Sequence, residues 1–444
     1  MKILKFGGTS VGSKEMIEKT AKIVVDAKKE DSIIVVVSAM SGITNTLIEI
    51  CELAKNGKQE TFFPLLESIK EKHIQVAQAL CNNNCDIFFT NEINKYIIQL
   101  EDILKGVSLL KQLSDKGKAK ILYFGEILSS LLVSLAISQA GYPSKNYFSR
   151  DLLICSGKFI DGDCNYKSSE EKITDFLKNK DLEKEIPVIT GFGGGDEEGN
   201  IYLFDRGGSD YVATLLGRFG QASSIEIWTD VDGIMSADPR IVETPILWEE
   251  LDYSICAEFA IAGAKVLHPK TISPVQRKEI AIVIKNTFNP KAPGTKICSN
   301  KSEGIKGIHI DDNQVILSFI DPAMIGSIGY ISEVVKVFSS LKISLDAIAT
   351  TETSFSLSLR KKDYTEKLLE ELEKIKEFFH LEVLENITKI SLIGTHINEY
   401  DILRDVGEIV MMSKGAYGKS LTLFVKTNDS KRLIQTLHKK IFQK

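Results

Sequence analysis

Short apolar runs alternate with longer stretches of helical periodicity through the first two thirds of the chain. Residues 3–6 (ILKF) and 32–40 (SIIVVVSAM) are strongly apolar, and each precedes a stretch with apolar positions three or four residues apart. After the first run, Ile17, Ile23 and Val24 fall on one helical face. Near-continuous apolar strands that alternate with helices are typical of a parallel sheet covered by helices on both faces. We therefore expect an α/β fold for this part of the chain.

Three further apolar segments extend the pattern: 118–128 (KAKILYFGEIL), 185–195 (EIPVITGFGGG) and 224–233 (SIEIWTDVDG). We predict a strand in each of them, with a long helical stretch before the first. Glycine and polar residues gather where the predicted strands end. Because open α/β sheets bind their ligands at the carboxyl ends of the strands, we expect the functional residues along this edge.

A domain boundary is predicted in segment 285–297 (KNTFNPKAPGTKI), where two prolines and a glycine interrupt the pattern. We predict a catalytic domain over residues 1–292 and a regulatory region over residues 293–444. The second region contains an internal repeat, because the sequence from Ser354 aligns with the sequence from Ser420. Both copies begin with an alternating strand and end in an amphipathic helix.

Each repeat also has a matching strand upstream, so we interpret the region as α+β, with two small βαββα modules. The modules span about residues 312–382 and 388–444. Small tandem modules at the end of an enzyme are more plausibly ligand sensors than catalysts. This interpretation predicts a regulatory role for the C-terminal region.

The composition is that of an ordinary globular chain of 444 residues, with 43% hydrophobic and 26% charged residues and a net charge of −5. A mildly acidic protein has no electrostatic reason to bind nucleic acid or a membrane surface. No stretch approaches the roughly 18 uninterrupted apolar residues of a membrane span. The seven cysteines are irregularly spaced, and Cys81 and Cys85 have no nearby partners for a metal site. Lys2 and Lys5 bracket too short an apolar run for a signal peptide, so we expect a cytoplasmic protein.

The glycine turn in segment 5–15 (KFGGTSVGSKE) raises the question of phosphate binding. It follows a strand and precedes a helix, which is the layout of an anion-binding helix N-terminus. The common phosphate loop reads GxxxxGK[ST]; here Gly7 and Gly12 have that spacing, but Ser13 and Lys14 follow in inverted order. Lys5 is placed to reach into the turn from the strand. The residues alone leave two interpretations open: an ordinary glycine turn, or a phosphate cradle of another design.

Six more polar clusters accompany this turn: SAMSGITNTL (38–47), FGE (124–126), GFGGGD (191–196), FDRGGSDY (204–211), WTDVDGIMSADPR (228–240) and GAKVLHPKT (263–271). One such cluster is usually only a turn. Taken alone, Lys265 suits a solvated helix surface, Asp210 a first helical turn and Glu126 a helix cap. Their recurrence at predicted strand ends favours a single site.

The order and spacing of these segments resemble those of the aspartokinases, within the amino-acid kinase family. The segments KFGGTSVGS, DRGGSDY and GAKVLHP occur in the family's order, and the tail resembles the paired ACT domains of those enzymes. The resemblance spans practically the whole chain. It implies an amino-acid kinase fold and transfer of a phosphoryl group from ATP to the side-chain carboxylate of L-aspartate, the first step of the lysine, threonine and methionine branch. It also implies that the glycine turn holds phosphates.

The chemistry of such a reaction fits the residue inventory. A carboxylate substrate is already an ionised nucleophile and needs no general base. The transferring phosphoryl group instead requires positive charge and fixed geometry, and we expect Lys5 and Lys265 to supply that charge. The resemblance implies that Asp210 orients both lysines. It also implies backbone amides that bind phosphate oxygens, those of Gly7, Gly8 and the glycines 193–195.

For the acceptor, the resemblance assigns Arg206 to a bidentate contact with the α-carboxylate of aspartate. Glu126 suits the α-ammonium group. Ser41, Thr44 and Ser209 complete the implied aspartate pocket.

For the nucleotide, Thr229, Asp230, Asp238 and Arg240 match the family's binding segment. Met235 stands where the family often has an aromatic residue, and the rich glycine run 193–195 favours a loose loop. Mg²⁺ is implied by the phosphates of ATP, and we find no dedicated protein cage for it.

The tail is expected to bind lysine as a feedback inhibitor. In lysine-sensitive aspartokinases the effector binds between ACT domains of two subunits, which implies a homodimer or a larger assembly. The residues that match this site are Met324, Ser344, Asp346, Thr351 and Glu352. Two of them are acidic and suit a cationic ligand. We expect the second repeat to support dimerisation and to form no equivalent site.

Three alternatives stay in view. The chain could act on glutamate, carbamate or a nucleotide, although the RGGSD segment and the paired tail argue against this. It could be an amino-acid sensor with a decayed catalytic domain, although the joint presence of Lys5, Asp210 and Lys265 argues against that. A fusion with homoserine dehydrogenase is not expected at this length.

Overall fold

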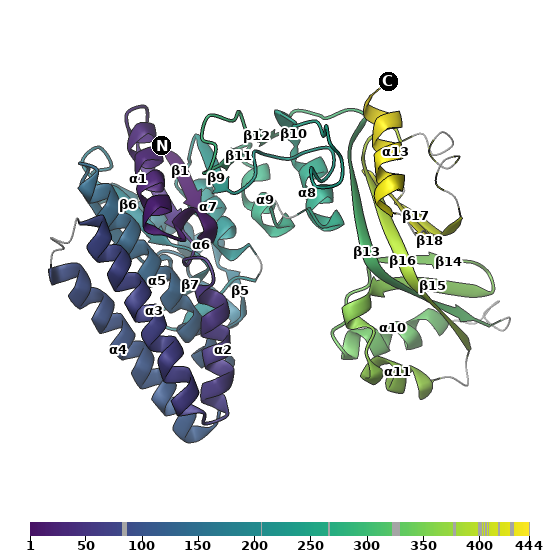
Figure 1. Cartoon of the computed structure of the whole chain (residues 1–444), viewed down its shortest axis with the longest axis horizontal. Helices are drawn as coiled ribbons and strands as arrows, with labels where there is room; N and C mark the ends of the chain where they lie inside the picture. Colours follow the sequence, from purple (N-terminus) through teal and green to yellow (C-terminus); the bar gives the residue numbers. More distant parts are fainter. Residues whose placement is uncertain are drawn as a thin grey trace. The chain divides into compact units, whose positions relative to one another are not determined.

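The computed structural model describes residues 1–81, 87–205, 207–264, 267–321, 329–375, 379–397, 402, 404, 406, 408–415, 418–426 and 430–443. The chain forms two compact units (Figure 1). Unit 1 comprises Met1–Ile234, Leu247–Tyr253 and Val266–Asn300, and unit 2 comprises Met235–Ile246, Ser254–Lys265 and Lys301–Lys444. Two short segments of the predicted catalytic domain therefore pack with the C-terminal region. The predicted domain boundary at residue 292 stays a prediction.

Unit 1 is built around an eight-stranded sheet in the order β10-β12-β11-β9-β1-β2-β6-β3. Its strands are β1 (Lys2–Phe6), β2 (Ile33–Val37), β3 (Ser144–Tyr147), β6 (Ile186–Thr190), β9 (Ser224–Thr229), β10 (Glu250–Asp252), β11 (Ala281–Asn286) and β12 (Thr295–Cys298). Only the pairing of β11 with β12 is antiparallel among these strands. Two small hairpins accompany the sheet: β4 (Cys155–Lys158) with β5 (Asp161–Cys164), and β7 (Gly193–Gly195) with β8 (Ile201–Leu203).

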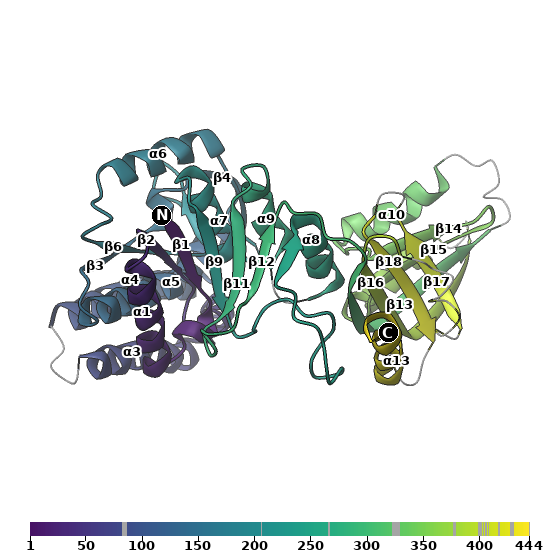
Figure 2. The same cartoon turned by 90° about the horizontal axis from the view of Figure 1, so that it is seen from above.

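Helices cover both faces of this sheet, as the sequence predicts. The helices of unit 1 are α1 (Lys14–Lys28), α2 (Ile43–Lys55), α3 (Gln59–Leu80), α4 (Ile87–Leu110), α5 (Asp115–Gln139), α6 (Tyr166–Lys178), α7 (Gly208–Phe219) and α9 (Pro269–Gln276), with short 3₁₀ turns at Gly8–Val11 and Ser149–Asp151. Figure 2 shows α1 and α5 on one face and α6 and α7 on the other. The predicted helical face of α1 is confirmed, since Ile17, Ile23 and Val24 are buried.

Segment 118–128 is a helix, so the predicted strand there is wrong. It belongs to α5, which begins after the cap residue Ser114, whose hydroxyl accepts a hydrogen bond from the amide of Gly117 at 3.1 Å. Every residue from Ile121 to Ile137 is buried, because α5 packs between the sheet and its helical neighbours. Burial on all sides removes the polar face that would reveal a helical period. The cluster FGE therefore lies within a helix and not at a strand end.

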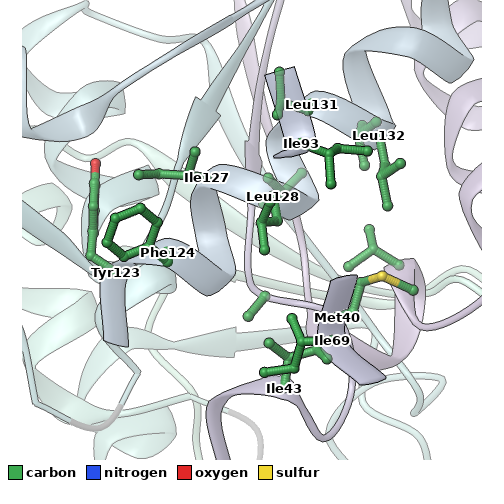
Figure 3. Close-up of a cluster of buried hydrophobic side chains, with 14 of the residues drawn as sticks. Met40, Ile43, Ile69, Ile93, Tyr123, Phe124, Ile127, Leu128, Leu131 and Leu132 are labelled. Carbon is green, nitrogen blue, oxygen red and sulfur yellow. The ribbon is translucent and has the colours of Figure 1, made fainter. Parts of the chain in front are cut away.

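The core beside α5 is formed by helices that run side by side. Figure 3 shows Leu131 and Leu132 of α5 beside Ile93 of α4, and Ile43 of α2 close to Ile69 of α3; all of them belong to one buried cluster. This packing holds α5 firmly against the end of β2. The position of every side chain on the inner surface of α5 is consequently set by the core.

Helix α5 is also long and apolar enough to cross a membrane by length and composition, the one such helix among the described residues. The most apolar 18-residue window of α5 is 94% buried within the protein. Core helices of soluble proteins meet the same criteria of length and composition. Glu126 and several serines interrupt the apolar residues.

Unit 2 contains a six-stranded sheet in the order β14-β15-β13-β16-β18-β17. Its elements are β13 (Ile305–Ile320), α10 (Tyr330–Ser340), β14 (Ala347–Thr350), β15 (Ser354–Arg360), a 3₁₀ turn at Lys361–Asp363, α11 (Glu366–Glu373), β16 (His380–Gly394), β17 (Ile409–Lys414), β18 (Ser420–Lys426) and α13 (Ser430–Phe442), together with α8 (Tyr253–Ala262), which crosses from unit 1. The long strands β13 and β16 pair antiparallel at the centre.

The predicted repeat is visible in this sheet. The elements β13, α10, β14, β15 and α11 give the first βαββα order, and β16, β17, β18 and α13 supply the three strands and the last helix of the second. The predicted first helix of the second repeat, near Leu403, lies outside the described residues. Helices of each module bury apolar residues against one face of the sheet, for example Phe338 against β13 and Leu437 against β18.

Candidate active site

A cavity of about 300 Å³ lies at the carboxyl ends of the central strands of unit 1. Segments that follow β1, β2 and β6 line it, together with α5 and the start of α7. The lining residues are Lys5, Gly8, Ser38, Ala39, Met40, Ser41, Gly42, Thr44, Glu126, Phe192, Asp205, Gly207, Gly208, Ser209 and Asp210. The structure thus brings together seven residues that the sequence assigned to catalysis or substrate binding.

Lys5 and Asp210 form a buried ion pair in this cavity. The ammonium of Lys5 lies 2.5 Å from the Asp210 carboxylate, and Lys5 is 7% exposed. Lys5 belongs to β1, which is held between β2 and β9 at the centre of the sheet. Asp210 lies in the first turn of α7, where the helix dipole favours an acidic residue. The pair therefore fixes a positive charge at the end of a central strand.

The glycine turn after β1 packs directly against the segment after β2. The amide of Ser41 donates to the carbonyl of Gly8 at 3.1 Å, and the amide of Gly7 donates to the carbonyl of Trp228 at 3.0 Å. A Cβ atom on Gly8 would come within 2.9 Å of the Ala39 carbonyl oxygen. Only glycine fits this close approach, which brings the backbone of the turn to the cavity. Gly7 adjoins the cavity without lining it.

Glu126 reaches the cavity from the middle of α5 and is 3% exposed. Its Oε1 accepts a hydrogen bond from the Ala39 amide at 3.1 Å, and its Oε2 has no hydrogen-bond partner among the described residues. Gly125 permits this packing, since a Cβ atom there would lie 2.8 Å from the Cβ of Ala39.

Burial raises the pKa of Glu126 to about 8, although the Ala39 hydrogen bond and the charge of Lys5 act in the opposite direction. A cation that enters the cavity would favour the ionised carboxylate.

The start of α7 supplies a second polar feature that the sequence reasoning used only in part. Gly207 has a φ of 76°, and Gly208 and Ser209 open the helix beside the cavity. The first amides of a helix have no partner within the helix, and the helix dipole adds positive potential. The N-terminus of α7 can therefore bind an anion together with Lys5. The sequence feature that indicates this anion site is the pair of glycines, Gly207 and Gly208, directly before a helical pattern.

The prediction for the glycine run is wrong in one respect. Gly193–Gly195 form the buried strand β7 and do not line the cavity. The amides of Gly193 and Gly195 already donate to the carbonyls of Gly191 and Leu153, both at 2.9 Å. These two amides are therefore not available to phosphate oxygens. The run is a tightly packed strand and no loose loop.

Several predicted nucleotide residues lie outside this cavity. Thr229 ends β9, and its hydroxyl contacts the carboxylate of Asp230 at 3.2 Å. Asp238 and Arg240 belong to unit 2, where they pair with each other at 2.6 Å. Their predicted role stays a prediction.

Three predicted residues, Arg206, Lys265 and Met324, lie outside the described residues. Conversely, Phe192 and Asp205 line the cavity, although the sequence analysis gave them no role. Phe192 has a φ of 69°, which is unusual for a residue with a side chain. A signal for Phe192 was available, because it lies within the cluster GFGGGD.

The predicted effector residues fall at the two ends of β14 in unit 2. Asp346 directly precedes this strand, whereas Thr351 and Glu352 follow it. Five residues of extended strand span about 16 Å, so a single chain does not bring Asp346 and Thr351 together. Ser344 is exposed and lies two residues before Asp346, at the same end of β14.

Asp346 is already engaged within the chain. Its Oδ2 lies 3.1 Å from the ammonium of Lys389 and 3.1 Å from the side-chain amide of Gln314. Both partners are buried, and Oε1 of Gln314 has no hydrogen-bond partner among the described residues. A cationic ligand at Asp346 would have to share this carboxylate or displace Lys389.

Comparison with known proteins supports the arrangement. The amino acid kinase family model matches residues 1–286. Aspartokinase 1, chloroplastic, of Arabidopsis thaliana is 30% identical over 467 residues, which covers 99% of this chain and 80% of the relative. The structure of E. coli aspartokinase III in complex with lysine and aspartate (T-state) has a TM-score of 0.86 and 27% identity, covering 100% of this chain and 99% of that chain. The same enzyme in complex with aspartate and ADP (R-state) has a TM-score of 0.82 and 27% identity, with full coverage of both chains. The chain belongs to the amino acid kinase family and, within it, to the aspartokinases.

Proposed function

We propose that the protein is an aspartate kinase, which uses ATP to phosphorylate the side-chain carboxylate of L-aspartate to 4-phospho-L-aspartate. The observation that carries this proposal is the combination, in one cavity, of the Lys5–Asp210 pair, the N-terminus of α7 and the buried carboxylate of Glu126. The E. coli relative has been solved with aspartate and with ADP. A cavity of about 300 Å³ is large enough for an amino acid and part of a triphosphate.

In this proposal, cationic groups of the protein contact the phosphoryl group, and an anionic group contacts the amino group of aspartate. Lys5 offers its ammonium to the transferring phosphoryl group, and Asp210 keeps that ammonium in place. The first amides of α7 stabilise the negative charge that develops on phosphate oxygens. Oε2 of Glu126 accepts hydrogen bonds from the α-ammonium of aspartate, and Ser41, Thr44 and Ser209 line the same cavity. The roles of Arg206 at the α-carboxylate and of Lys265 at the phosphates complete the proposal.

ATP is the proposed phosphoryl donor. Its phosphates would be bound by Lys5, Gly7, Gly8 and Lys265. The rest of the nucleotide would be bound by Thr229, Asp230, Asp238 and Arg240. Gly8 lines the cavity, and a side chain there would collide with the carbonyl oxygen of Ala39, so only glycine lets the backbone of the turn approach a phosphate from this side. Mg²⁺ would accompany the nucleotide and neutralise phosphate charge. The described residues contain no group of three acidic, histidine or cysteine side chains that could hold a metal ion. We therefore assign the metal to the phosphates and to water.

Feedback inhibition by lysine is the proposed regulation. Asp346 lies beside β14, which is an edge strand of the sheet in unit 2. Antiparallel pairing of β14 with its copy, about an axis between Ile348 and Ala349, would set Asp346 of one chain opposite Thr351 of the partner subunit. This register explains how residues at opposite ends of β14 could form one site. We therefore propose a homodimer formed through the C-terminal modules. We propose a cytoplasmic location for the enzyme.

A hydroxamate assay tests the proposal directly. The purified chain, ATP and Mg²⁺ are supplied with aspartate, glutamate or no acceptor, and acyl phosphate is trapped as the hydroxamate. Activity with aspartate well above that with glutamate is expected. If the protein phosphorylates glutamate but not aspartate, the assigned substrate is wrong. If it phosphorylates neither, the result favours the alternative of a non-catalytic amino-acid sensor. Repeating the assay with lysine, threonine or methionine identifies the effector.

A further inference from the structure

Two cysteines face each other on the small hairpin of β4 and β5 in unit 1. Cys155 and Cys164 are directly opposite in the antiparallel register, at the end of the hairpin away from its two-residue turn. The pair that flanks such a turn exchanges hydrogen bonds, so by alternation Cys155 and Cys164 form a non-hydrogen-bonded pair. Side chains of such pairs are close, with Cα atoms about 4.5 Å apart, which is within the range that a disulfide spans. Both thiols are free in this structure.

The surroundings of the two thiols differ in a way that suits stepwise oxidation. Cys155 is 3% exposed, whereas Cys164 is partly exposed. The Cys164 sulfur lies 3.3 Å from the hydroxyl of Ser169. A hydrogen bond from the Cys155 thiol lowers the pKa of Cys164, and the same hydrogen bond raises the pKa of Cys155. Cys164 is thus the more accessible and more readily ionised thiol, and Cys155 is the buried partner that resolves the first product.

The hairpin packs against strand β7, which directly follows a residue that lines the candidate active site. The Cys155 sulfur lies against Gly194 so closely that a Cβ atom on Gly194 would collide with it. The amide of Gly195 donates to the carbonyl of Leu153, and Ile154 forms a bridge with Gly195. Strand β7 begins one residue after Phe192, which lines the cavity. A movement of the Cys155 sulfur is therefore transmitted to the cavity wall over a few residues of backbone.

We propose that Cys155 and Cys164 are a reversible disulfide site through which a thiol–disulfide couple controls the phosphoryl-transfer cavity. The Cys164 thiolate attacks one sulfur of a low-molecular-weight disulfide, which breaks that S–S bond and releases one thiolate. The Cys155 thiol then loses its proton and attacks the Cys164 sulfur, which forms the internal disulfide and releases a second thiolate. Two protein thiols are oxidised and one disulfide molecule is reduced to two thiols. A dithiol reverses the reaction.

Oxidation has a structural consequence at β7. The two sulfurs must approach to about 2.05 Å, so the Cys155 sulfur leaves its place against Gly194 or carries the hairpin with it. Either change loosens the contact that supports β7 and Phe192. We expect kcat to fall several-fold in the oxidised enzyme and to recover on reduction. This effect on activity rests on the proposed kinase function, whereas formation of the disulfide does not.

The experiment treats the full chain with oxidised glutathione and maps cysteines by alkylation and mass spectrometry. The expected product is an internal Cys155–Cys164 disulfide, formed with loss of two hydrogen atoms and removed by dithiothreitol. Amide hydrogen exchange over residues 191–196 should rise in the oxidised protein, and hydroxamate formation should fall.

Substitutions separate this site from the other cysteines. Cys164→Ser, with Cys164→Ala as a second choice, keeps the packing of Cys155 and should make activity and exchange insensitive to the treatment. A variant with Cys81→Ser and Cys85→Ser should respond as the unmodified protein does. Absence of the Cys155–Cys164 disulfide overturns the inference, and so does oxidation that leaves exchange over residues 191–196 unchanged. A reduced protein that lacks kinase activity but forms the disulfide and shows increased exchange would reject the proposed function and leave the disulfide site standing.

Discussion

The ammonium of Lys389 lies 3.1 Å from the carboxylate of Asp346, and this contact joins the central strand β16 to the start of the edge strand β14. Lys389 is 8% exposed. The side chain of Lys389 thus already pairs with the carboxylate that we propose as the binding partner of the free amino acid lysine. Effector binding becomes a competition between two ammonium groups of the same chemistry, and the internal one has the advantage of a fixed position.

Lys389→Ala should increase sensitivity to lysine. The substitution leaves the Asp346 carboxylate without its cation, so free lysine gains a vacant partner, and half-inhibition should occur at a several-fold lower concentration. Asp346→Ala should have the opposite effect and leave activity without lysine intact. Inhibition curves of the hydroxamate assay check both variants. Lys426→Ala, which removes only an exposed pair with Glu408, serves as the control. Weaker inhibition in Lys389→Ala would mean that Lys389 shapes the effector site and does not compete there.

Lys5→Ala and Lys265→Ala should each lower kcat far more than they raise KM for aspartate. A cation that stabilises the transferring phosphoryl group contributes on the order of 3 kcal/mol or more to the transition state, which corresponds to a loss of about a hundredfold or more in kcat. Steady-state kinetics measure the two parameters separately. Lys2→Ala is the matched control, because Lys2 lies on the same strand and its ammonium pairs with the exposed carboxylate of Glu30 at 3.9 Å. An unchanged kcat in either active-site variant rejects its assigned role.

Arg206→Ala should weaken aspartate binding and leave ATP binding nearly intact, since its guanidinium is assigned to the α-carboxylate. Arg206→Lys should not restore binding, because an ammonium cannot make the forked contact. Calorimetric titration with each ligand distinguishes the two sites. Arg277→Ala, at the exposed end of α9, should bind both ligands normally. An equal loss of ATP affinity would move Arg206 to the nucleotide side of the cavity.

Glu126→Gln should stabilise the ligand-free protein at alkaline pH. Burial raises the pKa of Glu126 from its ordinary value of 4.5 to about 8. Between these values the native state binds the proton more tightly than the unfolded state, so stability falls as pH rises through this window. A neutral glutamine avoids this cost, which is about 3–5 kcal/mol above pH 8 for a shift of this size.

The gain in unfolding temperature of Glu126→Gln should therefore be largest above pH 8 and disappear near pH 4.5. Aspartate binding should weaken in the same variant, because the amide cannot pair with the α-ammonium. Glu101→Gln, which removes a surface pair with Lys105, should show no such pH dependence. A pH-independent difference for Glu126→Gln would contradict the proposed protonation.

Local sequence was sufficient for much of this protein. The glycine turn after β1, the paired glycines before α7 and the repeated modules follow from short-range patterns, because strands, turns and helix caps depend on neighbouring residues. The placement of Lys5 and Asp210 at one sheet edge followed from the rule that parallel strands end together.

Tertiary structure decided the rest. Residues 118–128 form a helix because α5 is surrounded by core, and a uniformly apolar segment carries no period that would separate helix from strand. That packing alone brings Glu126 to the cavity. The glycine run became a buried strand because Tyr202 and Leu153 lie against it, and the amide of Gly195 donates to the carbonyl of Leu153, a partner distant in sequence. The Lys389–Asp346 contact likewise joins residues of two modules, and it forms only because their strands belong to one sheet. Local sequence patterns do not predict a contact of this kind.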